Sequence, residues 1–171
     1  DVYANELFNF LTGGIKISYK PVKVIFNKID YGYYLQEDFF DKYLIEKNNR
    51  RESVIFEAIN DSLDYNYIGL DNEFLTLANN FNNQYVNDFD SFLELFDIEK
   101  LKATILITCI LNDSHPLLNT NLHWYYNPAS GLIEPILREF KVFKHSKKDI
   151  DIRNYFLDNS ILTALYEKKI K

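Results

Sequence analysis

The chain has 171 residues, a length that suits one domain, and its 47% hydrophobic content is ample for a packed core. A net charge of −6 argues against a general nucleic-acid binder, which normally carries a basic face. The single cysteine excludes an internal disulfide framework, and no apolar run approaches the roughly 20 residues of a membrane span. We expect a single domain over residues 1–171, with neither a nucleic-acid partner nor a membrane span.

Apolar spacing predicts a helix and a hairpin at the start of the chain. The helix covers residues 2–12 and ends at Gly13 and Gly14, which favour a helix C-terminus. Its apolar residues at helical spacing are Tyr3, Leu7, Phe8 and Leu11. Residues 21–26 and 31–36 each have the pattern of a strand, and the polar turn between them joins them in a hairpin.

Helices predominate in the middle of the chain. Residues 38–46 predict an amphipathic helix, and its inward-facing residues are expected to be Phe39, Phe40, Tyr43 and Leu44. A polar loop then leads to a short predicted strand over residues 53–57, whereas residues 59–70 have no clear period. Asp71 is a candidate cap for a helix that ends near Phe81.

A longer helix is predicted over residues 97–111, with an Asp as its N-cap, after a short helix that ends near Phe96. The predicted buried stripe of the longer helix consists of Ile98, Leu101, Ile105 and Cys109. We interpret Cys109 as a small buried hydrophobe rather than as a nucleophile. Two further short helices are predicted over residues 149–157 and 158–169.

The segment after the longer helix combines a polar loop with a second hairpin. Residues 122–126 alternate as a half-buried strand does, with Trp124 and Tyr126 expected in the core, and residues 127–131 have turn chemistry. An acid, Glu139, follows the returning strand. A helix, then a loop with Asp, His and Asn, then a hairpin that returns an acid is how phosphotransferases assemble a metal and phosphate site. The order of helices and hairpins indicates an α+β fold.

Three stretches, in chain order, resemble the CotH kinase family of secreted and spore-coat atypical protein kinases. Residues 24–37, VIFNKIDYGYYLQE, are similar to the family's strand–turn–strand, where an Asn-Gly turn precedes Gly-x-Tyr and a Glu. Residues 40–52, FDKYLIEKNNRRE, are similar to its helix and Arg-Arg-Glu-Gly turn. Residues 119–136, NTNLHWYYNPASGLIEPI, are close to its Asn-x-x-x-Tyr-Tyr-Asn-Pro-x-x-Gly-x-x-Glu-Pro-Ile. The resemblance covers about residues 5–140.

The resemblance implies a distant protein-kinase-like fold, with residues 1–36 as the end of the small lobe and residues 37–171 as a mostly helical large lobe. It also implies ATP as the phosphoryl donor, Mg²⁺ or Mn²⁺ as the cation, and Ser or Thr hydroxyls of a protein as the acceptors. Glu6 would be the regulatory-helix acid that pairs with the nucleotide-binding lysine, or else an acid on the helix face without catalytic work. Glu37 would lie at the hinge beside the nucleotide.

This sequence departs from the family at several positions. The family's lysine strand and nucleotide loop precede the regulatory helix, at which this chain begins without a methionine. We therefore expect a piece that is incomplete at its N-terminus. Lys28 stands in place of the turn glycine, and Ser53 in place of the glycine after Arg-Arg-Glu. Glu139 stands where the family has an Asp, and its extra methylene alters the geometry offered to a metal.

Asp113 is the candidate residue for accepting the proton of a substrate hydroxyl or orienting it, and the alternative is a solvated or capping Asp. Asn121 is the candidate ligand of a metal–phosphate unit, with Asn119 as the second candidate, and the alternative is an Asn that shapes the loop. Glu139 is a candidate metal ligand or else a surface residue at a strand end. Such an oxygen-rich set suits Mg²⁺ or Mn²⁺ rather than zinc.

His115 is a candidate for shaping the catalytic loop by hydrogen bonding, and the alternative is a packing or capping histidine. We assign no chemistry to His123 and His145, and the histidines and the cysteine do not have the spacing of a zinc site. Arg50 and Arg51 are able to bind phosphate, although such a charged loop is usually just solvated.

Two functions remain open at this point. The first is ATP-dependent phosphoryl transfer, in which Asp113 orients the hydroxyl while Asn121 and Glu139 hold the cation. The second is a catalytically inactive pseudokinase that serves as a binding or scaffold module for coat or surface proteins. The absent lysine strand and the Glu139 substitution favour the second function. The resemblance alone implies a secreted protein or one at a cell or spore surface.

Overall fold

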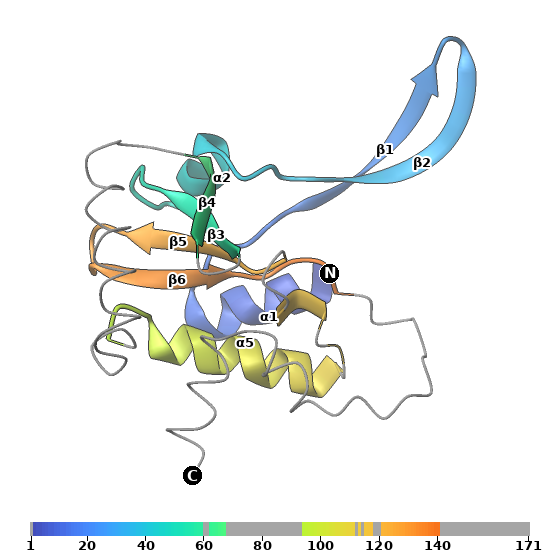
Figure 1. The fold of residues 1–171 in the computed structure, drawn as a ribbon. Helices are drawn as coiled ribbons and strands as arrows, with labels where there is room; N and C mark the ends of the chain where they lie inside the picture. Colours follow the sequence, from blue (N-terminus) through green and yellow to red (C-terminus); the bar gives the residue numbers. More distant parts are fainter. Residues whose placement is uncertain are drawn as a thin grey trace.

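A computed structural model describes residues 2–59, 62–67, 94–111, 113, 115–117 and 121–140. Its elements confirm the predicted α+β class, because helices are combined with two antiparallel sheets (Figure 1). Within these residues the helices are α1 (Val2–Thr12), α2 (Lys42–Lys47), α5 (Ile98–Leu111) and the 3-10 helix η1 (His115–Leu117). The strands are β1 (Tyr19–Phe26), β2 (Ile29–Glu37), β3 (Ile55–Ile59), β4 (Ser62–Tyr67), β5 (His123–Asn127) and β6 (Leu132–Ile136).

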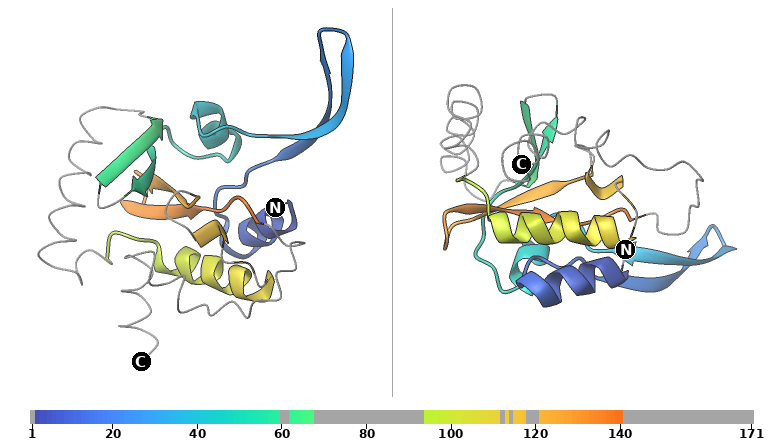
Figure 2. Two further views of the ribbon diagram at one scale, coloured as in Figure 1. Left: turned by 45° about the vertical axis from the view of Figure 1, so that its right-hand side comes forward. Right: turned by 90° about the horizontal axis from the view of Figure 1, so that it is seen from below.

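The larger sheet has the strand order β4-β3-β5-β6, and all its neighbours are antiparallel. α1 and α5 lie side by side along it (Figures 1 and 2) and share a small apolar core with the segment after β6. The hairpin β1–β2 forms a separate sheet that projects away from this body (Figures 1 and 2). Its exposed apolar and aromatic side chains are Ile25, Phe26, Ile29, Tyr31, Tyr33, Tyr34 and Leu35.

β5 is buried on both faces, whereas the sequence predicted a half-buried strand. Tyr125 packs into a core with residues of α2, and Trp124 on the opposite face meets Phe96 edge to face, with ring centroids 5.1 Å apart. The strand lies between β3 and β6, so it is central in its sheet. The prediction that Trp124 is a core residue is confirmed, but Tyr126 is only half-buried.

The predicted helix over residues 2–12 is confirmed, but the next one is shorter than predicted. α2 begins at Lys42 because the Asp41 carboxylate accepts hydrogen bonds from the backbone N–H groups of Tyr43 (2.9 Å) and Leu44 (3.2 Å). Both helices bury one side and leave the other in solvent. Phe39 and Tyr43 were expected to face inward and are instead exposed. Of the apolar residues at helical spacing in α1, Tyr3 and Leu11 are also exposed.

α5 has the predicted N-cap, since Asp97 Oδ1 accepts a hydrogen bond from the backbone N–H of Lys100 (3.1 Å), but it buries a different face. Its buried residues are Leu101, Thr104, Ile107 and Thr108. The two threonine hydroxyls donate to backbone carbonyls of the preceding turn, at 3.0 and 2.7 Å, and are thereby satisfied inside the core. Cys109 is exposed, so its interpretation as a buried hydrophobe is wrong. Of the predicted stripe, Leu101 alone is fully buried.

The strands differ from their predicted bounds mainly because the turns are shorter. The first hairpin turns over two residues, Asn27 and Lys28, and β4 pairs with β3 in a segment for which no element was predicted. No described helix is long and apolar enough to cross a bilayer. The predicted helices that lie wholly or largely outside the described residues are those over residues 71–81, 149–157 and 158–169 and the short one that ends near Phe96.

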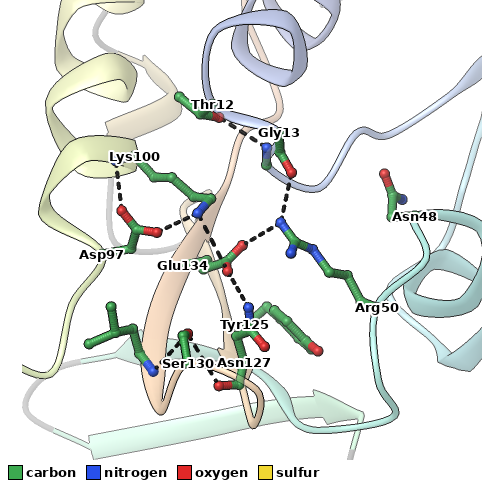
Figure 3. Close-up of polar contacts among 12 residues, drawn as sticks. Thr12, Gly13, Asn48, Arg50, Asp97, Lys100, Tyr125, Asn127, Ser130 and Glu134 are labelled. Carbon is green, nitrogen blue, oxygen red and sulfur yellow. Dashed lines mark hydrogen bonds and ion pairs between the residues drawn. The ribbon is translucent and has the colours of Figure 1, made fainter.

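A buried carboxylate joins the elements around the second hairpin (Figure 3). Glu134 on β6 is 1% exposed, and its Oε2 lies 3.1 Å from Arg50 Nη2. Its Oε1 lies 2.6 Å from Asn127 Nδ2 and 3.5 Å from Lys100 Nζ. Arg50 Nη2 also donates to the carbonyl oxygen of Gly13 (2.7 Å). This Glu134 cluster therefore ties the end of α1, the loop after α2, the first turn of α5 and the β5–β6 hairpin to one point.

Replacing Glu134 with glutamine should lower the free energy of unfolding by about 3–5 kcal/mol, because Arg50 and Lys100 lose the carboxylate that compensates their partly buried charges. Urea unfolding at neutral pH measures this. The matched control is Glu99→Gln, which breaks an exposed pair with Lys102 and should change the free energy by less than about 1 kcal/mol. Equal effects of the two substitutions would contradict the role assigned to the Glu134 cluster.

Lys28→Gly should stabilise the projecting hairpin by about 0.5–1 kcal/mol. Asn27 and Lys28 both have positive φ, 49° and 66°, which is the geometry of a type I′ turn and strains a lysine. Hydrogen exchange of the β1 and β2 amides measures the local opening. The control is Gly32→Ala at φ 84°, which should destabilise the same hairpin although space for the methyl group is open. Faster exchange in Lys28→Gly would show that the turn is not strained.

Candidate functional site

Three of the four residues predicted from the polar loop and the second hairpin contact the fourth, His115. The backbone N–H of His115 donates to Asp113 Oδ1 (3.1 Å). Asn121 Nδ2 donates to the carbonyl oxygen of His115 (2.9 Å) and lies 3.1 Å from its Nε2. The same Nε2 lies 3.3 Å from Glu139 Oε2. The segment after α5, η1, the residues just before β5 and the segment after β6 thus contribute to one cluster, which we call the His115 cluster.

His115 Nε2 lies near both Asn121 Nδ2 and Glu139 Oε2, and it forms a hydrogen bond with one of them at a time. Its Nε2 accepts a hydrogen bond from Asn121 when it carries no proton, and it donates to Glu139 when it carries one. The hydrogen bond from Asn121 to the His115 carbonyl holds the amide in place in both cases. The position of one proton therefore decides whether the ring is bonded to the amide or to the carboxylate.

Glu139 is further held by the residue before it. Arg138 Nη2 lies 2.5 Å from Glu139 Oε1 and 3.6 Å from Glu37 Oε1, and the guanidinium sits 5.1 Å from the ring centroid of Phe40. Glu139 has a φ of 61°, a strained value for a residue with a side chain, and such strain persists where surrounding contacts hold it. Arg138 thereby connects the end of β2, where Glu37 lies, to the His115 cluster.

The donor chemistry of the cluster fits a hard divalent cation, because two carboxylates and an amide supply oxygen atoms. Glu139 presents both its oxygens to cationic or hydrogen-bonding groups of the chain itself, Arg138 and His115. Among the described residues, no group of three or more His, Cys, Asp or Glu side chains is close enough to hold a metal. A cation bound at Glu139 would therefore have to displace Arg138 or His115 and draw Asp113 closer.

The remaining sequence candidates lie elsewhere. Glu6 projects from α1 and pairs with Lys16 (2.5 Å), so the structure does not bring it to the His115 cluster. Asn119 and His145 lie outside the described residues. Arg50 belongs to the Glu134 cluster, and its alternative as a solvated loop residue is wrong.

His123 is a core residue rather than a solvent-facing one. Its ring stacks on Phe40 at a centroid distance of 3.8 Å and an angle of 6°, and Nδ1 lies 3.3 Å from the carbonyl oxygen of Asn121. Burial lowers the pKa of His123 to about 4, an effect that the contact with Asn121 opposes. The imidazole is consequently neutral at physiological pH and packs in the core next to Asn121.

Sequence reasoning missed two residues beside the cluster, Arg138 and Tyr19. Arg138 had a visible signal, since it interrupts an apolar strand end next to a candidate ligand. Tyr19 had none, because it lies far away in the chain and reaches the site by pairing with Glu37 across β1 and β2. Burial raises the pKa of the Tyr19 hydroxyl, and the nearby Glu37 and Glu139 carboxylates raise it further.

In comparisons with known proteins, no family model and no curated protein matches this chain. The resemblance to CotH kinases therefore stays a prediction that depends on three short stretches. The functional proposal combines this resemblance with the geometry of the His115 cluster.

The free energy of unfolding should fall as the pH drops from about 6.5 to about 4, because the unfolded chain protonates His123 in this range and the folded chain does not. The slope due to this histidine is at most about 1.4 kcal/mol per pH unit. Urea unfolding at a series of pH values measures it. In His123→Gln this part of the slope should be absent, with other titrations unchanged. Identical slopes in the two proteins would contradict the lowered pKa.

Proposed function

We propose that this chain is the cation- and phosphate-binding part of a CotH-like atypical protein kinase, which transfers the γ-phosphoryl group of ATP to Ser or Thr hydroxyls. The observation that supports this most is the convergence of Asp113, Asn121 and Glu139 on His115. These residue types were predicted for a phosphotransferase site from their chain order alone. The contact between His115 and Glu139 joins residues 24 positions apart, whereas the contacts of His115 with Asp113 and Asn121 are local in the chain.

The element order is consistent with this proposal. In a kinase-like reading, α1 is the regulatory helix, β1 and β2 are small-lobe strands, and Glu37 at the end of β2 is at the hinge beside the nucleotide. α5 then leads into the catalytic loop, and the β5–β6 hairpin leads into the cation-binding acid. Glu6 lies on the regulatory helix, where its present partner is Lys16.

Each polar residue of the cluster would have a distinct task. Asp113 would accept a hydrogen bond from the substrate hydroxyl and orient it, as a positioned carboxylate does in this class of reaction. Asn121 and Glu139 would hold Mg²⁺ or Mn²⁺, which neutralises charge on the ATP phosphates. His115 would keep the loop in shape through its backbone bond to Asp113 and its ring contacts with the other two.

A second candidate is a catalytically inactive pseudokinase that binds coat or surface proteins. The observation that favours it is the pairing of Glu139 with Arg138 and His115, which fills the place of a cation with groups of the chain. Glu139 in place of the family's aspartate also favours the pseudokinase. Both candidates place the protein outside the cell or on a cell or spore surface, and they differ in whether nucleotide and cation can bind.

With MgATP at about 100 times its dissociation constant, the protein should gain about 2.7 kcal/mol of stability, or roughly 5–10 °C in Tm. Asn121→Ala and Glu139→Gln should lose this shift because they remove cation ligands. Asp113→Asn should keep it, since the amide oxygen still accepts the bond from His115. In a longer form of the protein that includes the lysine strand, the same substitution should abolish phosphate transfer to a Ser/Thr substrate. Thermal melts and radiolabel transfer measure the two effects.

The matched control is Asp30→Asn, which changes an exposed carboxylate in the projecting hairpin and should leave both effects intact. No shift of Tm at millimolar MgATP in the unmodified chain would support the pseudokinase. Transfer that persists in Asp113→Asn would contradict the role given to Asp113.

A further inference from the structure

The outward side of α5 is apolar, although a helix at a protein surface normally presents polar side chains to solvent. Residues 103–111 of this helix contain no charged side chain. One side of the helix packs into the apolar core that it shares with α1. The other side carries the exposed apolar residues Leu106 and Ile110 beside Cys109. A helix that is apolar on both sides usually lies between two packed layers.

The neighbouring helix α1 adds to this apolar surface, because the two helices lie side by side and run in opposite directions (Figures 1 and 2). Leu7 of α1 and Ala103 of α5 pack at the edge of the shared core, where the helices meet. Contiguous apolar patches on a protein surface usually mark an interaction site. The exposed apolar side chains of this surface, which we call the α1–α5 face, are Tyr3, Phe10, Leu11, Leu106 and Ile110, with exposed fractions between 51% and 87%.

The last described residue of the chain packs against the same two helices. Phe140 is 6% exposed and belongs to the apolar core that α1 and α5 share. Residues 141–157, if extended, span up to about 56 Å. α5 has 14 residues and is therefore only about 21 Å long. The segment that follows residue 157 is consequently able to reach any part of the α1–α5 face.

The net charge of the C-terminal segment is opposite to that of the rest of the chain. Residues 141–171 contain eight Lys or Arg residues and four Asp or Glu residues, a net charge of +4. Since the whole chain carries −6, residues 1–140 carry −10. Residues 68–93, which also lie outside the described residues, contain four acidic residues and no basic one. Attraction between opposite charges therefore favours the C-terminal segment as the occupant of the α1–α5 face.

We propose that residues 158–169 cover the α1–α5 face as an amphipathic helix. The apolar residues Ile161, Leu162 and Leu165 recur at helical spacing in this segment, and they supply the side that packs on the face. The contact anchors the chain on the C-terminal side of Glu139, while β6 holds it on the N-terminal side. This inference concerns packing, so it does not depend on the proposed function.

The test uses Cys109, the chain's only cysteine, which lies on the outward side of α5. Its rate of reaction with dithionitrobenzoate reports whether the face is covered. In the full chain, Ile161→Lys combined with Leu165→Lys should raise this rate at least about tenfold, because the thiol loses its cover. The matched control is Asn159→Lys combined with Thr163→Lys, which adds the same charge on the opposite side of the predicted helix and should leave the rate unchanged.

A substitution on the face itself provides the second measurement. Leu106→Lys should raise the Cys109 rate to the same extent and lower Tm by about 5 °C. Tyr34→Lys in β2, where the side chain is also 53% exposed, should change neither. Equal rates in the unmodified chain and in the Ile161→Lys, Leu165→Lys variant would overturn the proposal. A rate that falls as the protein concentration rises would also overturn it, because a second copy of the chain would then cover the face.

Discussion

The ion pair between Glu134 and Arg50 is the contact on which the candidate site depends. A carboxylate that is 1% exposed is tolerated when cations lie against it, and here Arg50 and Lys100 do so from two different elements. Arg50 sets β6 against the loop after α2, and Lys100, 3.5 Å from Glu134 Oε1, sets β6 against the first turn of α5. α5 leads to Asp113 and β6 leads to Glu139, so both carboxylates of the site extend from elements that meet at Glu134.

The charged side chains of the site are paired with one another within the chain. Glu139 and Glu37 face Arg138, and Glu139 also faces His115, so each carboxylate has a cationic or hydrogen-bonding partner before any ligand arrives. Under the proposed function, a cation or nucleotide would exchange with these partners. The positive φ of Glu139 shows that the acid is held in a strained position. The two candidate functions differ in the outcome of that exchange.

The sequence predicted most helices and hairpins correctly, but it did not predict which residues and strands pack or pair with one another. The first helix, the two hairpins and the cap at Asp97 follow from spacing, turn residues and side-chain oxygens, all of which act over a few residues. Cys109 was placed in the core because hydropathy ranks it above threonine, whereas Thr104 is buried because its hydroxyl bonds its own helix. β4 was missed because its pairing with β3 is set by tertiary structure. The predicted residues of the site came from chain order, but the contribution of Tyr19 required the register of β1 with β2.

The central claim is that Asp113, Asn121 and Glu139 surround one place for a cation that carries nucleotide phosphates. Paramagnetic broadening of amide resonances by substoichiometric Mn²⁺ with ATP tests it most directly, because broadening falls steeply with distance from the ion. The account predicts that the amides of these residues and of His115 broaden first and together, with Glu134 unaffected. Broadening that is spread over exposed acids such as Glu99 and Asp30, and is absent from the His115 cluster, would contradict it.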